Sequence, residues 1–233
     1  MDYTYDQIAK MIDHSLLQPT LSDLQLEAGC RLARRYNVAS VCIKPYALRR
    51  CAELLAGSTV KASTTIGFPH GGHTTRVKEF EARQALDDGG QELDFVVNIG
   101  KVLSGDWSYV RADIAAVTAV THERGEIVKI IFENCWLTDA HKIWLCEICG
   151  ELGCDFVKTS TGYGEGGATN DDLRLMRRHS PPAVQVKAAG GVRTLDKLLE
   201  VRALGVARCG ASKTAEMLDD CRRRLGLAPI SAE

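Results

Sequence analysis

The architecture can be predicted from one stretch, VQVKAAGGVRTLDKLLEVRALGVARC, residues 184–209. It begins with a short apolar run (Val184–Ala188), turns at a pair of glycines, and continues as an amphipathic segment over Leu195–Leu204. Gly205 ends that segment, and a second apolar run follows over Val206–Cys209. The order predicts strand, turn, helix and strand. Because the helix carries the chain back to the same end of the sheet, we expect the two strands to be parallel.

The same order of apolar run and amphipathic segment repeats along the chain. Eight runs are expected as strands: Met11–Leu16, Ala39–Ile43, Val60–Ile66, Leu93–Val97, Ile127–Phe132, Asp155–Thr159, Val184–Ala188 and Val206–Cys209. Helices are expected at Leu21–Tyr36, Tyr46–Ala56, Thr74–Asp88, Tyr109–Arg124, Thr138–Leu152, Asn170–Arg178, Leu195–Leu204 and Thr214–Leu225. Helix starts are expected at Thr138-Asp139, Asn170-Asp171-Asp172 and Thr194, and helix ends at Gly89-Gly90, Gly125, Gly153 and Gly205.

Eight such units predict an α/β protein with one domain over residues 1–233. The expected fold is a single (β/α)8 TIM barrel with a short N-terminal helical segment before Met11. An open, doubly wound sheet is the alternative. If Met11–Leu16 were helical, only seven strands would remain and closure of the barrel would be in doubt.

Composition excludes several classes of protein. The 233 residues contain 29 Lys and Arg against 30 Asp and Glu, without the basic excess of a nucleic-acid binder. No uncharged apolar run reaches the roughly 18 residues of a membrane span. The start, MDYTYD, does not resemble a signal peptide. Nine scattered cysteines fit reduced thiols. We therefore expect a cytoplasmic protein that binds neither nucleic acid nor membrane.

Three lysines interrupt the apolar strands and suggest chemistry. Lys129, Lys158 and Lys187 lie within runs that are otherwise buried, and Asp94 lies in a fourth. Each lysine alone is also explained by a salt bridge or by a side chain that reaches the surface, and Asp94 by a structural hydrogen bond. Together they favour a lysine nucleophile, because burial and a second ammonium lower the pKa of an amine. That chemistry is Schiff-base formation with a carbonyl compound.

Glycine-rich turns follow the last two predicted strands. Gly190-Gly191-Val192-Arg193 and Gly210-Ala211-Ser212-Lys213 each precede a predicted helix, where backbone N–H groups and a basic side chain attract anions. In TIM barrels these two loops are the recurrent phosphate site. The Gly-rich segment Thr161–Gly167 is expected to close over the ligand. Cys146-x-x-Cys149 and the pair His70 and His73 lack the further ligands of a metal site, so no metal is expected.

These segments resemble the 2-deoxyribose-5-phosphate aldolases, class I aldolases of (β/α)8 fold. The resemblance runs from Ile12-Asp13-His14-Ser15-Leu16-Leu17 to Gly210-Ala211-Ser212. Its most specific motifs are Val157-Lys158-Thr159-Ser160-Thr161-Gly162 and the segment Val186–Arg193. It implies that Lys158 forms the Schiff base, that Lys187 keeps Lys158 deprotonated, that Asp94 relays protons with Lys187 through water, and that Lys129 supports them. It also implies a set of substrate and phosphate contacts: Asp13, Ser15, Cys42, Thr159, Gly162, Gly190, Gly191, Val192, Arg193, Gly210, Ser212 and Lys213.

The implied activity is a lyase reaction of deoxyribonucleotide catabolism. The family cleaves 2-deoxy-D-ribose 5-phosphate reversibly to D-glyceraldehyde 3-phosphate and acetaldehyde, without a metal or organic cofactor. Alternatives are a Schiff-base aldolase with another aldehyde acceptor and a non-catalytic barrel that binds sugar phosphates. A homodimer is expected by analogy.

Three positions depart from the family pattern. Lys213 stands where Ser is frequent, and Ser15 stands where Thr is common. Residues 228–233 read APISAE, without the terminal Tyr that assists proton transfer in some members.

Overall fold

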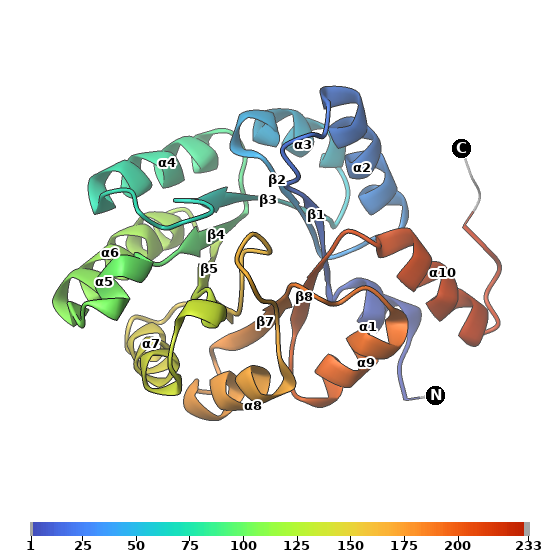
Figure 1. Ribbon diagram of the computed structural model, residues 1–233. Coiled ribbons are helices and arrows are strands. Elements are labelled where there is room, and N and C mark those ends of the chain that lie inside the picture. Colours follow the sequence, from blue (N-terminus) through green and yellow to red (C-terminus); the bar gives the residue numbers. More distant parts are fainter. Residues whose placement is uncertain (1, 231–233) are drawn as a thin grey trace.

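The computed structural model describes residues 2–230, so the tail positions 231–233 lie outside the described residues. Eight parallel strands close into a barrel in the order of the sequence (Figure 1). Their bounds are β1 Ile12–Leu16, β2 Ser40–Ile43, β3 Lys61–Ile66, β4 Glu92–Val96, β5 Ile127–Ile131, β6 Phe156–Lys158, β7 Gln185–Ala189 and β8 Arg208–Ala211. The run from Met11 is a strand, and β1 pairs with both β2 and β8. The predicted TIM barrel is confirmed, and the open sheet is wrong.

Helices surround the barrel, as Figure 1 shows. Their bounds are α1 Tyr5–Ala9, α2 Asp23–Arg35, α3 Leu48–Leu55, α4 Thr75–Asp87, α5 Ile99–Leu103, α6 Trp107–His122, α7 Asp139–Glu151, α8 Asn170–His179, α9 Leu195–Ala203 and α10 Thr214–Arg224, with 3₁₀ turns η1 Pro45–Ala47 and η2 Asn134–Trp136. The predicted N-terminal helical segment corresponds to α1. The short helix α5 was not predicted, because five residues are too few to show a helical period. Within residues 2–230, no helix is long and apolar enough to cross a membrane.

One predicted strand boundary and one predicted helix cap change for local reasons. Strand β8 begins at Arg208, two residues after the predicted start at Val206. The N–H of Val206 donates to the carbonyl of Val201 (3.3 Å), and Gly205 has φ +84°, so Val206 belongs to the end of α9. Helix α8 is capped by Thr169, whose hydroxyl accepts from the N–H of Asp172, rather than by the residues from Asn170 onward.

The two faces of the strands differ in chemistry. Residues that face the helices are apolar and form one continuous buried core, with Leu93 and Phe95 on β4 as examples. Alternate residues on the same strands are buried but charged, as Glu92 and Asp94 show. Since successive side chains of a strand point to opposite faces, the charges are directed into the barrel. The apolar contacts between barrel and helices stabilise the fold, and the interior is left for polar groups.

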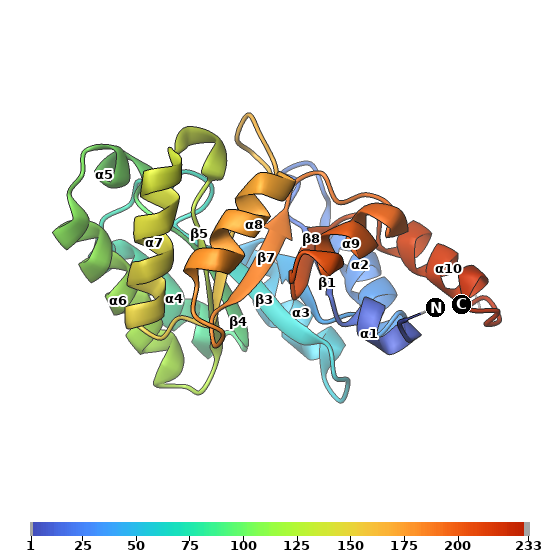
Figure 2. The same cartoon turned by 90° about the horizontal axis from the view of Figure 1, so that it is seen from below.

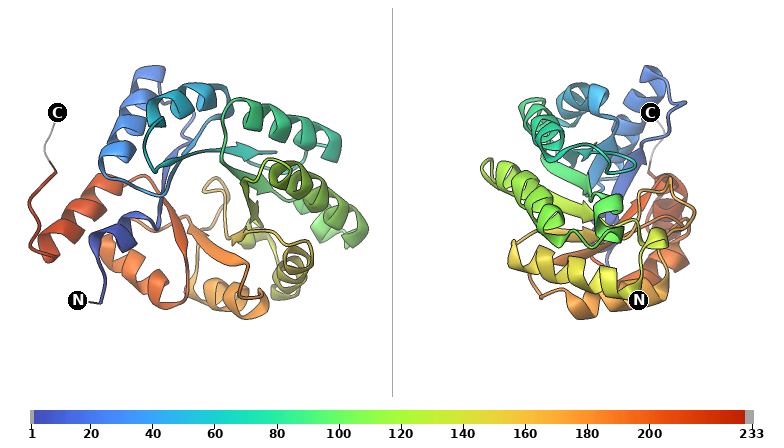
Figure 3. Two further views of the ribbon diagram at one scale, coloured as in Figure 1. Left: turned by 180° about the vertical axis from the view of Figure 1, so that it is seen from behind. Right: turned by 60° about the vertical axis from the view of Figure 1, so that its left-hand side comes forward.

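The side and rear views show which end of the barrel is the carboxyl end of the strands and where the N-terminal helix lies. In Figure 2 the arrowhead of β7 points toward the side on which the gold loop after β6 lies, so this is the carboxyl end of the strands. Helix α1 lies beside α10 (Figure 3). The hydroxyl of Tyr5 in α1 donates to the carbonyl of Tyr36 (2.9 Å), and Arg222 in α10 lies 5.0 Å from the centre of its ring. These contacts attach the N-terminal segment to the helix layer, at α10 and at the end of α2.

Candidate active site

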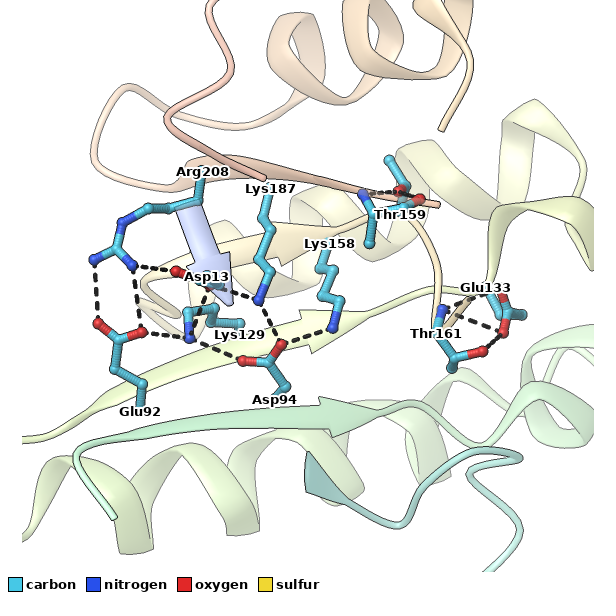
Figure 4. A network of polar contacts seen from close by, with 11 residues as sticks. Asp13, Glu92, Asp94, Lys129, Glu133, Lys158, Thr159, Thr161, Lys187 and Arg208 are labelled. Atoms are coloured by element: carbon cyan, nitrogen blue, oxygen red, sulfur yellow. Dashed lines mark hydrogen bonds and ion pairs between the residues drawn. The ribbon is translucent and has the colours of Figure 1, made fainter. Parts of the chain in front are cut away.

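Three lysines and one aspartate meet inside the barrel. Lys158 on β6 lies opposite Lys187 on β7, and Asp94 on β4 lies opposite Lys129 on β5. One carboxylate oxygen of Asp94, Oδ2, lies 2.7 Å from Nζ of both Lys158 and Lys187, and the other, Oδ1, lies 2.8 Å from Nζ of Lys129 (Figure 4). The four residues that the sequence predicted as catalytic are therefore in direct contact.

The lysines differ in how many carboxylates surround them. Among the described residues, Lys158 pairs only with Asp94. Lys187 pairs with Asp94 and also with Asp13, at 2.6 Å. Lys129 pairs with both of these and with Glu92, at 2.6 Å. Since carboxylates stabilise the ammonium form, Lys158 is the lysine best able to become a neutral amine.

The pKa values follow these surroundings. Burial lowers the pKa of Lys158; Asp94 opposes this, and the charge on Lys187 adds to it. Burial also acts on Lys187, but Asp13 and Asp94 outweigh it and raise the pKa of that lysine. The carboxyl of Asp94 is buried too, yet the three ammonium groups hold its pKa well below the ordinary value. The site thus combines one lysine that loses its proton easily with one that keeps it.

A second layer of charge lies beneath the lysines and was not predicted as part of the site. Arg208 donates to Asp13 (2.6 Å) and to Glu92 (3.1 Å), and Glu92 pairs with Lys129. Asp13 was expected to contact substrate from β1. It lines the cavity and is also the carboxylate that joins Lys187 to Arg208.

A cavity of about 250 Å³ opens above the lysines at the carboxyl ends of the strands. Twelve of the predicted residues line it: Asp13, Ser15, Cys42, Lys158, Gly162, Lys187, Gly190, Gly191, Val192, Arg193, Gly210 and Ser212. Asp94 and Lys129 do not line the cavity and lie below it. The thiol of Cys42 is buried, and burial with the nearby Asp94 raises its pKa to about 11, so it is protonated at neutral pH.

Two glycines shape the loop after β7. Gly190 has φ +80°, and a Cβ there would lie 2.8 Å from Cα of Gly167 in the loop after β6. Gly191 has φ +96° and faces open space, so it leaves room for a ligand beside its backbone. Arg193 is exposed at the cavity and forms no salt bridge with any residue in the described part of the chain. Helices α9 and α10 begin directly after the two loops, and their N-termini attract anions.

Two predicted contact residues point elsewhere. The hydroxyl of Thr159 donates to the carbonyl of Ala189 and accepts from its N–H, at 3.1 and 3.0 Å, so it joins β6 to β7 inside the wall. The ammonium of Lys213 pairs with Glu216 one turn along α10, at 2.9 Å, and does not line the cavity. The Thr159 hydroxyl is thus occupied by the backbone of β7, and the exposed side chain of Lys213 lies outside the cavity lining.

Comparisons with known proteins show which family the chain belongs to. The family model described as DeoC/LacD family aldolase matches residues 7–212. The chain belongs to this aldolase family. It is 66% identical over 229 residues to the deoxyribose-phosphate aldolase of Rhodopirellula baltica, covering 98% of this chain and 95% of that protein. It is 46% identical to the deoxyribose-phosphate aldolase of Thermococcus gammatolerans, covering 92% and 96%.

The fold of this aldolase is shared by a solved relative. The structure of deoxyribose phosphate aldolase from Aeropyrum pernix, described as tetrameric, superposes with a TM-score of 0.87 at 26% identity, covering 94% of this chain and 92% of that one. The protein described here is therefore an aldolase, a carbon–carbon lyase, built on the TIM barrel.

One further residue of this aldolase contacts the loop that lines the cavity. Glu133 follows β5, has φ +60° and is buried. Both of its carboxylate oxygens lie 3.3 Å from the backbone N of Thr161, and one accepts from the Thr161 hydroxyl (Figure 4). The loop that Thr161 begins lines the cavity with Gly162 and Tyr163. Its sequence signal was weak, because a single Glu after a strand is normally a surface residue.

Proposed function

We propose that this aldolase reversibly cleaves 2-deoxy-D-ribose 5-phosphate to D-glyceraldehyde 3-phosphate and acetaldehyde through a Schiff base on Lys158. The observation that carries the proposal is the position of Lys158. It lines the cavity, pairs with one carboxylate, and has a lowered pKa beside an ammonium group that stays charged. A neutral amine that faces a cavity is the nucleophile needed by a carbonyl substrate. The names of the relatives support the choice of sugar phosphate.

The residues can carry the reaction in the synthetic direction as follows. The neutral amine of Lys158 adds to the carbonyl carbon of acetaldehyde. The oxygen takes up one proton from the amine and one from the group formed by Asp94 and Lys187, and it leaves as water to give an iminium ion. The iminium withdraws electrons, so a methyl proton passes to the group formed by Asp94 and Lys187, which leaves an enamine. The enamine carbon then bonds to the aldehyde carbon of glyceraldehyde 3-phosphate, whose oxygen takes up a proton. Water hydrolyses the new iminium and frees Lys158.

The two loops after β7 and β8 provide the phosphate site of this proposal. Backbone N–H groups beside Gly191 and Ser212 lie at the starts of α9 and α10, and Arg193 supplies a charge without a competing salt bridge among the described residues. A phosphate dianion is stabilised by such N-termini and by a cation. Lys213 is left out of this proposed phosphate site, since its side chain does not line the cavity. We propose a cytoplasmic role in deoxynucleoside breakdown and a homodimeric assembly, which light scattering can measure.

Trapping with borohydride tests the proposal directly. Borohydride added with acetaldehyde reduces an iminium to a stable amine, and peptide mass mapping should place the added ethyl group on Lys158. Lys158→Ala should lose at least about a thousandfold in cleavage rate, because the covalent step is removed. Lys61→Ala, at an exposed lysine of β3, is the matched control and should keep full activity. Near-normal activity in Lys158→Ala, or an adduct on another lysine, contradicts the Schiff base at this position.

A further inference from the structure

Seven ionisable side chains form one connected cluster inside the barrel (Figure 4). Its members are Asp13, Glu92, Asp94, Lys129, Lys158, Lys187 and Arg208. Six of the side chains are at most 4% exposed, and that of Arg208 is 16% exposed. A single line of contacts connects its lower end to its upper end. Arg208 lies 3.1 Å from Glu92, Glu92 lies 2.6 Å from Lys129, Lys129 lies 2.8 Å from Asp94, and Asp94 lies 2.7 Å from Lys158.

The charges of this cluster do not balance when every member is ionised. Three lysines and Arg208 supply four positive charges, whereas the three carboxylates supply three negative ones. Inside a protein an uncompensated charge is costly, because little solvent screens it. Loss of one proton from one lysine gives three charges of each sign. The lysine that gives up this proton most easily is Lys158, since it has one carboxylate partner and the other lysines have two or three.

We propose that Arg208 and Glu92 are positioning residues that set the protonation state of Lys158 through Lys129, Asp13 and Asp94. Neither residue lines the cavity, so neither touches the reacting atoms. Arg208 supplies the fourth positive charge of the cluster. Glu92 supplies the third negative charge, so the cluster carries only one excess positive charge when every member is ionised. The inference rests on the proposed function, in which Lys158 must be a neutral amine to attack a carbonyl.

Other ionisable groups around the cluster do not change its count of positive and negative charges. Cys42 faces Lys158 from β2, and its thiol is uncharged at neutral pH because its pKa is raised to about 11 by burial. Below the cluster, Lys10 and Glu126 interact with Arg208 and Glu92 respectively. Lys10 donates to Asn37, Val38 and Thr59 at 2.8–2.9 Å. Both residues lie at the opposite end of the barrel from the cavity and carry opposite charges.

Two substitutions should move the pH dependence of Lys158 in opposite directions. Glu92→Gln removes a negative charge, so Lys158 should lose its proton at lower pH. Arg208→Gln removes a positive charge, so the cluster is balanced with Lys158 still protonated and deprotonation should need higher pH. Each shift should be about one pH unit, the size expected for one charge acting across several ångströms of protein. The readout is the midpoint of the rate of borohydride-trapped adduct formation with acetaldehyde, measured between pH 5 and pH 10.

A purely structural role predicts a different result. Both substitutions disturb buried salt bridges and should reduce stability, but loss of stability gives no opposite shifts in midpoint. Arg208→Lys keeps the charge and should keep the midpoint. The double variant Glu92→Gln/Arg208→Gln restores the wild-type excess of one positive charge and should return the midpoint toward wild type. It can be measured alone if a single variant does not fold. Asp113→Asn breaks the buried pair with Lys78 outside the barrel and is the control for destabilisation without a shift.

The outcomes separate the two proposals. No adduct on Lys158 in the unmodified protein overturns the proposed function. An adduct that forms normally, with the same midpoint in wild type, Glu92→Gln and Arg208→Gln, overturns only the role of the lower layer. Shifts of the same sign in both single variants, or a double variant that lies further from wild type than either, also overturn it. Opposite shifts that cancel in the double variant support it.

Discussion

Burial lowers the pKa of both Lys158 and His14, with different consequences. Lys158 faces the cavity, so its neutral form can react. His14 is the next residue after Asp13 on β1, so its side chain points to the opposite face of the strand. There its Nδ1 lies 2.8 Å from the hydroxyl of Thr214, the first residue of α10. Its pKa is lowered to about 4, and the neutral ring connects β1 to the helix that follows the β8 loop.

His14 should make stability depend on pH. Its pKa is 6.5 in the unfolded chain and about 4 in the fold, so the unfolded state binds the proton first as the pH falls. The free energy of unfolding should therefore decrease between about pH 6.5 and pH 4, by up to about 3 kcal/mol. Urea unfolding of His14→Gln should lack this component. His122→Gln, at a half-exposed histidine paired with Asp155, is the control. Equal pH dependence in wild type and His14→Gln would contradict the assignment.

At the scale of elements, the loop after β6 is held over the cavity from two sides. Glu133 accepts from the backbone and hydroxyl of Thr161 at the start of the loop. Tyr163 packs edge-to-face on Phe68 from the loop after β3, with 5.4 Å between ring centres. In Figure 1 this gold loop lies over the middle of the barrel. Because loops lose conformational freedom when they bind ligands, anchors that already hold the loop in place lower the cost of binding.

Loss of the Glu133 anchor should weaken substrate binding more than the chemical step. Glu133→Gln keeps the shape of the side chain but removes the charge that accepts from Thr161. The KM for the sugar phosphate should rise by roughly tenfold, the value of a hydrogen bond to a charged group, while kcat changes less. Glu165→Gln, at an exposed position in the same loop, is the matched control. An unchanged KM in Glu133→Gln, or a fall confined to kcat, would count against the anchor.

For the molecule as a whole, a buried lysine forms a salt bridge between two helices and a hydrogen bond to the barrel. Nζ of Lys78 on α4 lies 2.6 Å from Oδ2 of Asp113 on α6 and 3.0 Å from the carbonyl oxygen of Val96, and it lies over the ring of Phe95. Both side chains of the pair are at most 1% exposed. Burial lowers the pKa of Lys78, while Asp113 opposes that shift. The charged form of Lys78 is therefore stabilised inside the protein by the carboxylate of Asp113.

Breaking this salt bridge should reduce stability strongly. Asp113→Asn leaves a buried ammonium without its counter-charge and should cost about 3 kcal/mol or more in the free energy of unfolding, measured with urea. Asp87→Asn breaks the exposed pair with Arg124, whose side chains are 57% exposed, and should cost less than about 1 kcal/mol. The double variant Lys78→Met/Asp113→Leu should recover much of the loss. Equal costs for Asp113→Asn and Asp87→Asn would disprove a structural role for the buried pair.

Much of the barrel and the upper part of the site can be predicted from local sequence. Apolar runs and amphipathic segments repeat at short range, so the eight strands and the main helices follow from side-chain periodicity. Lys129, Lys158, Lys187 and Asp94 stand out because charges are rare in buried strands. Glycine pairs next to helix starts similarly locate the proposed phosphate loops, since their conformations depend on local backbone geometry.

The lower layer and the loop anchor depend on contacts between distant residues. Arg208 and Asp13 are 195 residues apart and meet only because β8 closes on β1. Thr159 has a polar side chain suited to substrate, yet its hydroxyl is held by the backbone of Ala189, 30 residues away, a partner that periodicity does not reveal. Sequence patterns show that a charge is buried, because burial is a property of one strand and its period. Which charge compensates it depends on the register of the closed barrel, and three-dimensional packing alone sets that pairing.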